Sequence, residues 1–198
     1  MDGRFPFSYR VACLLALMAV VVIVDFSRHG AQASKYREYG FILIAGMTGA
    51  VVGFVNDWMT CSLSPDYFII GKGLEPGPDL RMRAGKLGLQ AGLSAGIIGG
   101  AVCLFASVNK VPFSAARMRR LLAGLWMPLL GAALLGLGLP AVAGRLDPFH
   151  FSAQLGSMLT DERISRFQEV WWRHTGLYGG MIIGLGALIL VQRTTRAR

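Results

Sequence analysis

Five apolar runs, separated by short polar connections, make up most of the chain. Each run is long and continuous, whereas a half-buried strand alternates apolar and polar residues and a surface helix carries one polar face. The predicted membrane spans lie near residues 9–26, 39–56, 87–108, 120–143 and 174–191. The chain is therefore expected to be all-α, with residues 1–198 forming a single transmembrane domain, an integral membrane bundle of about five helices.

Composition and charge agree with this pattern. Hydrophobic residues make up 54% of the chain and charged residues 16%, and the mean hydropathy is +0.50, whereas soluble domains carry about a quarter charged residues. The net charge of +9 comes from Lys and Arg scattered between the runs, where they would lie at headgroup level. A nucleic-acid-binding protein would carry one contiguous basic patch, so the expected partner is the lipid bilayer and not nucleic acid.

The first run has two interpretations. A basic start, an apolar centre and the small-x-small sequence Ala31-Gln32-Ala33 imitate a signal peptide. However, the segment before that sequence is long and contains Asp25 and Arg28. A retained helix is therefore favoured, and cleavage of residues 1–33 remains the alternative.

The orientation in the membrane is nearly balanced. The 20 Lys and Arg residues divide ten against ten between the two sides, so the positive-inside rule does not choose. We expect the compact cluster Arg117, Arg119 and Arg120 and the basic C-terminal tail to face the cytoplasm. The predicted location is the cell membrane as a multi-pass protein, most consistent with a bacterial inner membrane.

Glycines recur at four-residue steps in three of the runs, which places them on one face of a helix. Such a face lets a neighbouring helix approach closely, and dispersion contacts then replace the hydrophobic drive that lipid removes. We interpret these glycines as packing faces, within the chain or between copies. They are Gly49 and Gly53, then Gly92, Gly96 and Gly100, then Gly176, Gly180 and Gly184.

Two further features shape the C-terminal half. Pro128 and Pro140 predict a kink and a break in the fourth span. Thr160, followed by two acids, predicts the start of an amphipathic helix near 160–173. Its apolar face continues into the last span, and it consists of Ile164, Phe167, Trp171, His174 and Tyr178.

The least generic stretch follows the second span, from Asn56 to Phe68. It carries an Asp, a Thr three residues later and a Ser-Pro-Asp-Tyr-Phe sequence: Asp57, Thr60, Ser64, Pro65, Asp66, Tyr67 and Phe68. In these residues the chain resembles a family of small bacterial membrane proteins of unassigned function. Asp66 stands where that family has Glu.

The resemblance extends to the glycine-rich third span. It also includes a His followed by Tyr and paired Gly in the last span, here His174, Tyr178, Gly179 and Gly180. It covers roughly half the chain. What the resemblance implies is the membrane architecture, and it implies no particular activity.

Asp57 is the residue with the clearest chemical demand. A carboxylate near hydrocarbon at the end of a helix needs a cationic or hydrogen-bonding partner. His174 begins the fifth span on the same side, so the two side chains are expected to meet. With Tyr178 they form a candidate catalytic group for proton transfer or, with Asp66, for metal coordination. The competing interpretation is a hydrogen-bond network that only fixes helix packing.

No motif specifies a reaction. The chain has no P-loop, dinucleotide fingerprint or nucleophile elbow, and its three histidines lack metal-site spacing, so no cofactor and no metal are predicted. The leading hypothesis is an accessory or assembly subunit that contacts other membrane proteins or its own copies through the glycine faces. The alternative is a membrane-embedded enzyme or transporter with a polar site around Asp57 and His174.

Overall fold

The computed structural model describes residues 6–106, 113–144 and 146–194, and over these residues the chain is helical without any strand. The end of the third predicted span (107–108) and the basic tail beyond Thr194 lie outside the described residues. Five helical segments are long and apolar enough to cross a membrane, so the prediction of an all-α, multi-pass membrane protein is confirmed. The elements are α1 (Phe7–His29), η1 (Gly30–Gln32), α2 (Lys35–Leu63), η2 (Tyr67–Gly71), α3 (Leu80–Ala106), α4 (Ala115–Gly124), α5 (Trp126–Ala143), α6 (Phe151–Leu155) and α7 (Asp161–Thr194).

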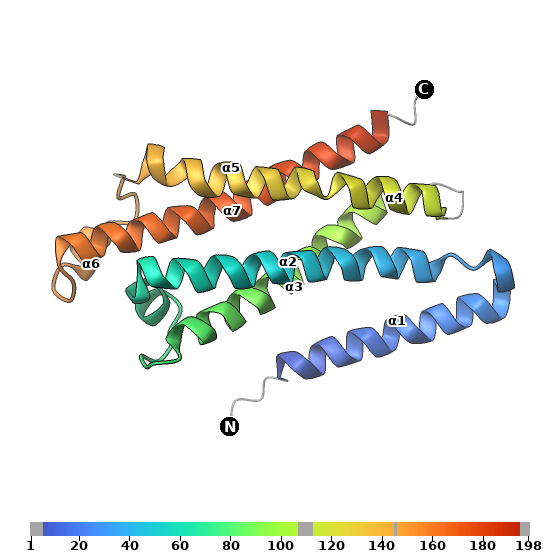
Figure 1. Ribbon diagram of the computed structural model, residues 1–198, viewed down its shortest axis with the longest axis horizontal. Coiled ribbons are helices and arrows are strands. Elements are labelled where there is room, and N and C mark those ends of the chain that lie inside the picture. The colour runs from blue at the N-terminus through green and yellow to red at the C-terminus, as the bar shows by residue number, and fades with distance from the viewer. Residues whose placement is uncertain (1–5, 107–112, 145, 195–198) are drawn as a thin grey trace.

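Two antiparallel helix pairs form the body of the molecule. Figure 1 shows α2 crossing α3, and α5 lying along α7. We call α2 with α3 the first hairpin and α5 with α7 the second hairpin. Contacts within each hairpin are far more extensive than those between the two hairpins.

The first hairpin closes through glycine. A Cβ atom built on Gly92 would lie 2.0 Å from the carbonyl oxygen of Gly49, and one on Gly53 would lie 2.1 Å from that of Gly88. The two backbones therefore touch directly, and no side chain fits between them. Gly96 meets the carbonyl oxygen of Ala45 in the same way, at 2.3 Å.

The second hairpin repeats this register. A Cβ atom on Gly180 would lie 2.0 Å from the carbonyl oxygen of Gly131, and one on Gly176 would lie 2.2 Å from that of Leu135. Gly184 approaches the backbone of α5 at Met127. In both hairpins, contact points four residues apart on one helix meet points four residues apart on the other, so the two hairpins share the same contact register.

α1 is the least integrated helix. Its apolar residues are almost all exposed, and Met18 alone among its described residues is buried. It is fixed to α2 at the connecting turn, where one carboxylate oxygen of Asp25 accepts the backbone N–H groups of Ser34 (2.8 Å) and Lys35 (2.9 Å). Asp25 thus supplies the N-terminal cap of α2, and Ala33, in the segment that imitates a cleavage site, is buried.

Several helices differ in extent from the predicted spans. The amphipathic segment and the fifth span form one helix, α7, of 34 residues. The kink predicted from Pro128 occurs at Leu125, between α4 and α5, because proline cannot bond to the carbonyl four residues earlier. Pro140, expected to break the helix, lies inside α5 close to its end at Ala143.

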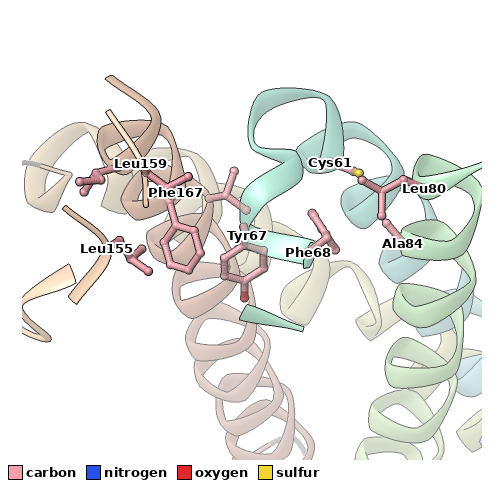
Figure 2. Packing of buried hydrophobic residues seen from close by; sticks show 10 residues of the cluster. Cys61, Tyr67, Phe68, Leu80, Ala84, Leu155, Leu159 and Phe167 are labelled. Atoms are coloured by element: carbon pink, nitrogen blue, oxygen red, sulfur yellow. The ribbon is translucent and has the colours of Figure 1, made fainter. Parts of the chain in front are cut away.

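The hairpins meet through two buried clusters at opposite ends of the bundle. At one end, the residues of η2 lie between α2 and α3 on one side and α6 and α7 on the other, as Figure 2 shows for Tyr67, Phe68 and Phe167. We call this group the cap cluster: Cys61, Tyr67, Phe68, Leu80, Ala84, Leu155, Leu159, Ile164, Phe167 and Val170. The far cluster at the other end contains Phe41, Cys103, Phe113, Leu121 and Leu188.

Candidate functional site

The structure brings Asp57 of α2 and His174 of α7 into contact at the cap-cluster end. His174 Nε2 lies 2.8 Å from Asp57 Oδ1, and both residues are buried, at 3% and 5% exposure. These residues are 117 positions apart in the chain. Their contact is a polar link between the first and the second hairpin.

Hydrogen bonding determines the proton content of this pair. His174 Nδ1 lies 2.9 Å from the carbonyl oxygen of Val170, which can only accept, so Nδ1 carries a proton. Nε2 faces a carboxylate oxygen, so one more proton lies between Nε2 and Oδ1. Whether that proton belongs to the imidazole or the carboxyl, the pair is neutral overall, which is the state that a low-dielectric site tolerates best.

Asn56 is a third member of the site that the sequence analysis missed. Its amide nitrogen donates to Asp57 Oδ1 at 3.0 Å and lies 3.3 Å from His174 Nε2. The available signal was an amide directly before the carboxylate at the end of an apolar run. Thr60 supports this turn, because its hydroxyl donates to the backbone oxygen of Asn56 at 2.7 Å. We call Asn56, Asp57 and His174 the polar cluster.

The Ser-Pro-Asp-Tyr-Phe stretch builds one wall of the site. Ser64 accepts the backbone N–H of Tyr67 at 3.3 Å, and Pro65 begins the following turn, where its missing N–H costs nothing. The resulting π-helical turn, η2, places the ring of Tyr67 4.8 Å and that of Phe68 5.9 Å from the His174 ring. Burial, and then the charge of Asp57, raise the pKa of Tyr67, so its phenol stays protonated.

Asp66 does not belong to the polar cluster. Arg163 of α7 pairs with it through Nε (2.9 Å) and a terminal nitrogen (2.5 Å), one to each carboxylate oxygen. Asp66 therefore bridges η2 to α7 and does not join Asp57 and His174, as metal coordination by the three side chains would require. Among the residues that the structure describes, no group of three or more His, Cys, Asp or Glu side chains could hold a metal ion.

Tyr178 lies one helical turn beyond His174 and is 39% exposed. Within the described part of the chain it forms no hydrogen bond with Asp57 or His174. Instead it lines two spaces at once, one large and one small. Its position is therefore that of a boundary residue and not of a third member of a hydrogen-bonded triad.

The large space, here the central cavity, lies between the two hairpins and has a volume of about 350 Å³. Ile98, Val102 and Ile182 line it and are 64%, 42% and 70% exposed, so the cavity opens on the lipid-facing surface. No charged residue is among the described residues of its lining. The lining residues are Ala45, Thr48, Gly49, Ala95, Gly96, Ile98, Gly99, Gly100, Val102, Cys103, Leu125, Pro128, Leu129, Tyr178, Met181, Ile182 and Leu185.

The small space, here the head pocket, has a volume of about 10 Å³ and is lined by Asn56 and Asp57. Gly49, Ala95, Tyr178 and Met181 line both spaces, so the head pocket lies next to the central cavity. Its remaining lining residues are Val52, Gly53, Gly92 and Leu177.

One oxygen of Asp57 is left for a ligand. Oδ1 is engaged by Asn56 and His174. Oδ2 accepts no hydrogen bond from the residues that the structure describes, and it is not among the fully enclosed atoms that lack a partner. The reactive atom of the polar cluster is therefore a carboxylate oxygen, since both nitrogens of His174 are occupied.

Aromatic and basic residues mark the depth of the polar cluster. The guanidinium of Arg81 lies 4.0 Å from the ring centroid of Trp58, the residue after Asp57. Trp171 and Trp172 precede His174 on α7 and contact each other edge to face. Because tryptophan and arginine prefer the headgroup region, the polar cluster lies just beneath that region and the central cavity extends towards the membrane centre.

Compared with family models, curated proteins and solved structures, the chain gives no match.

Proposed function

We propose that this protein binds a single-chain membrane amphiphile, with the apolar chain in the central cavity and the polar group at Asp57. The observation that carries the proposal is the adjacency of the two spaces between the hairpins. An apolar cavity of about 350 Å³, open to lipid, ends beside a pocket that Asn56 and Asp57 line. Its volume lies within the range of small-molecule sites, about 300–1,000 Å³.

The lining determines the class of ligand. Thr48 and Tyr178 are the polar side chains among the cavity residues, so neither an ion nor a sugar would find partners along its length. The glycines in the cavity wall have no side chains with which to fill the space. An alkyl or isoprenoid chain bound there would supply the missing dispersion contacts. The polar cluster lies near the depth of lipid headgroups, which supports a binding site for a membrane lipid. We propose that the protein is located in a cell membrane, specifically a bacterial inner membrane.

If the protein is an enzyme, the reaction would take place on the bound headgroup. Asp57 and His174 share one proton at 2.8 Å, so the pair can give up or take a proton while remaining a buried hydrogen-bonded unit. A charged conducting path receives no support, because no charged side chain from the described part of the chain lines the central cavity.

Filling the cavity tests the proposal. A leucine at position 99 would extend into the central cavity, since a Cβ on Gly99 lies 3.8 Å from Leu185 and meets no backbone. Gly186 is the matched control, because its Cβ position is open and it lines none of the spaces described here. Wild type, Gly99→Leu and Gly186→Leu would be purified in mild detergent, supplied with membrane lipid extract and weighed by native mass spectrometry.

We expect wild type and Gly186→Leu to retain one lipid of defined mass and Gly99→Leu to lose it. Equal retention by all three proteins, or no retained lipid in wild type, would overturn the proposal. Thermal unfolding of the three proteins shows whether each is folded.

A second candidate function, association with other membrane proteins or with a second copy, is supported by α1. Most of its apolar side chains are exposed, whereas the glycine faces of α3 and α7 are covered by α2 and α5. An accessory role would therefore use α1. Cys13 is exposed on α1, so oxidation in native membranes should trap a Cys13-linked dimer or heterodimer if α1 is an interface. Persistence of the monomer would count against this role, with Cys13→Ser as the control.

A further inference from the structure

We infer that the polar group of the bound amphiphile is a hydrogen-bond donor of the size of a hydroxyl or a primary amine. This inference rests on the proposed function and specifies its ligand. It follows from two independent properties of the head pocket, its volume and the chemistry of the atoms left unpaired at its wall.

The volume restricts the size of the group. A space of about 10 Å³ corresponds to about one water molecule. A phosphate, a quaternary ammonium or a sugar cannot enter without separating α2 from α3 at Gly53 and Gly92, where the two backbones of the first hairpin already touch. A terminal O–H or N–H group fits, with its alkyl chain continuing past Tyr178 into the central cavity.

The free atoms restrict the polarity of the group. Asp57 Oδ2 is an acceptor, and it has no donor among the described residues. The donors of the polar cluster are committed, because the Asn56 amide points to Asp57 and both His174 nitrogens are occupied. The Tyr178 hydroxyl is the side-chain donor that remains on the described lining of the head pocket. Among the described residues, neither Lys nor Arg lines the head pocket or the central cavity. A carboxylate or phosphate headgroup would therefore face a carboxyl group with no cation to balance it, whereas a donor would complete the hydrogen bonding of Asp57.

Tyr178 lies where the head pocket meets the central cavity. It lines both spaces, and its side chain is partly exposed. A phenylalanine at this position would keep the ring and so preserve the shape of the passage. It would remove the hydroxyl that could assist Asp57 in binding the headgroup.

Four amphiphiles with the same alkyl chain test the inference: hexadecanol, hexadecylamine, hexadecanoic acid and hexadecyl phosphate. Each would be added to delipidated wild type, and bound ligand would be measured by native mass spectrometry in competition with one reference lipid. We expect the alcohol and the amine to bind at least about tenfold more tightly than the acid and the phosphate, the effect of one charge-assisted hydrogen bond. Asp57→Asn should reduce this preference, and the ratio of alcohol to amine identifies which donor the site takes.

The outcomes separate the inference from the proposed function. If all four amphiphiles bind equally to wild type and are lost in Gly99→Leu, the inference fails while the proposed function stands. If none binds wild type better than Gly99→Leu, both fail. The comparison within wild type requires no polar-cluster variant, so instability of Asp57→Asn leaves the test intact. A preference for the acid or the phosphate would also overturn the inference.

Discussion

The closest backbone contact in the second hairpin provides a quantitative test of the fold. Replacing Gly180 with Ala would place a Cβ atom 2.0 Å from the carbonyl oxygen of Gly131, while replacing the adjacent Gly179 would place one in open space. Both substitutions change the same residue type in the same helix, one position apart. Their difference therefore isolates the contact.

The expected magnitude follows from that distance. A carbon and an oxygen atom in ordinary contact are well over 3 Å apart, so α5 and α7 must separate by about 1 Å to admit the methyl group. Overpacking of this kind costs about 1–3 kcal/mol. The gain in helix propensity, up to about 1 kcal/mol from glycine to alanine, applies equally at both positions and cancels in the comparison. Gly180→Ala should thus be about 1–3 kcal/mol less stable than Gly179→Ala.

Unfolding in mixed micelles at rising denaturing detergent, followed by tryptophan fluorescence, measures this difference. Both variants should migrate as the same oligomer as wild type, because the Gly180 contact is made within one chain. Equal midpoints for the two variants would refute the close approach of α5 and α7. A change of oligomeric state confined to Gly180→Ala would show that the glycine face of α7 packs against another chain.

Three further expectations concern ionisable groups. His174→Ala should lower the free energy of unfolding by about 3–5 kcal/mol in the same assay, because it leaves the buried Asp57 carboxyl without its partner. Asp57→Asn should lower it clearly less, because the new amide can donate to His174 Nε2. Asp66→Asn should lower the free energy of unfolding only slightly, since Arg163 is half exposed and water screens the ion pair, and should leave lipid retention unchanged. Burial raises the pKa of Asp147, but two backbone N–H groups of α6 outweigh it and hold the pKa below its usual range; this capping is therefore present at neutral pH and is lost as the pH falls through the lowered pKa. NMR of the α6 amides during acid titration, with Asp147→Asn as a mimic of the acid form, checks the sign.

Much of the candidate site could be found from the chain because its members stand out against apolar surroundings. Asp57 and His174 are titratable groups at the ends of two spans that finish on the same side, and their meeting required only that topology. Asn56 was missed since a neutral amide beside a carboxylate carries no comparable signal. The pairing of Asp66 with Arg163 could not be read from the sequence, because Arg163 lies 97 positions away and nothing local indicates it.

The first and last residues of the helices were also only partly predictable from the sequence. Hydropathy located the apolar centres of the spans, but α2 continues to Leu63 and α7 begins at Asp161. Backbone hydrogen bonds within a helix do not depend on the membrane, so polar residues extend the helix past the hydrocarbon edge. The terminal residues are decided by local groups, such as the Asp25 carboxylate at the start of α2.

What the sequence by itself determined is that the helices cross a membrane, because apolar length and the demand for internal backbone hydrogen bonds are properties of each segment alone. Which glycine faces meet was decided by the tertiary structure. A row of glycines allows close approach to any helix, so the pairing of α3 with α2 and of α7 with α5 depends on the register of both partners. The central cavity has the same origin: it exists because two closely packed hairpins meet at their ends, through the cap and far clusters, and leave space between them.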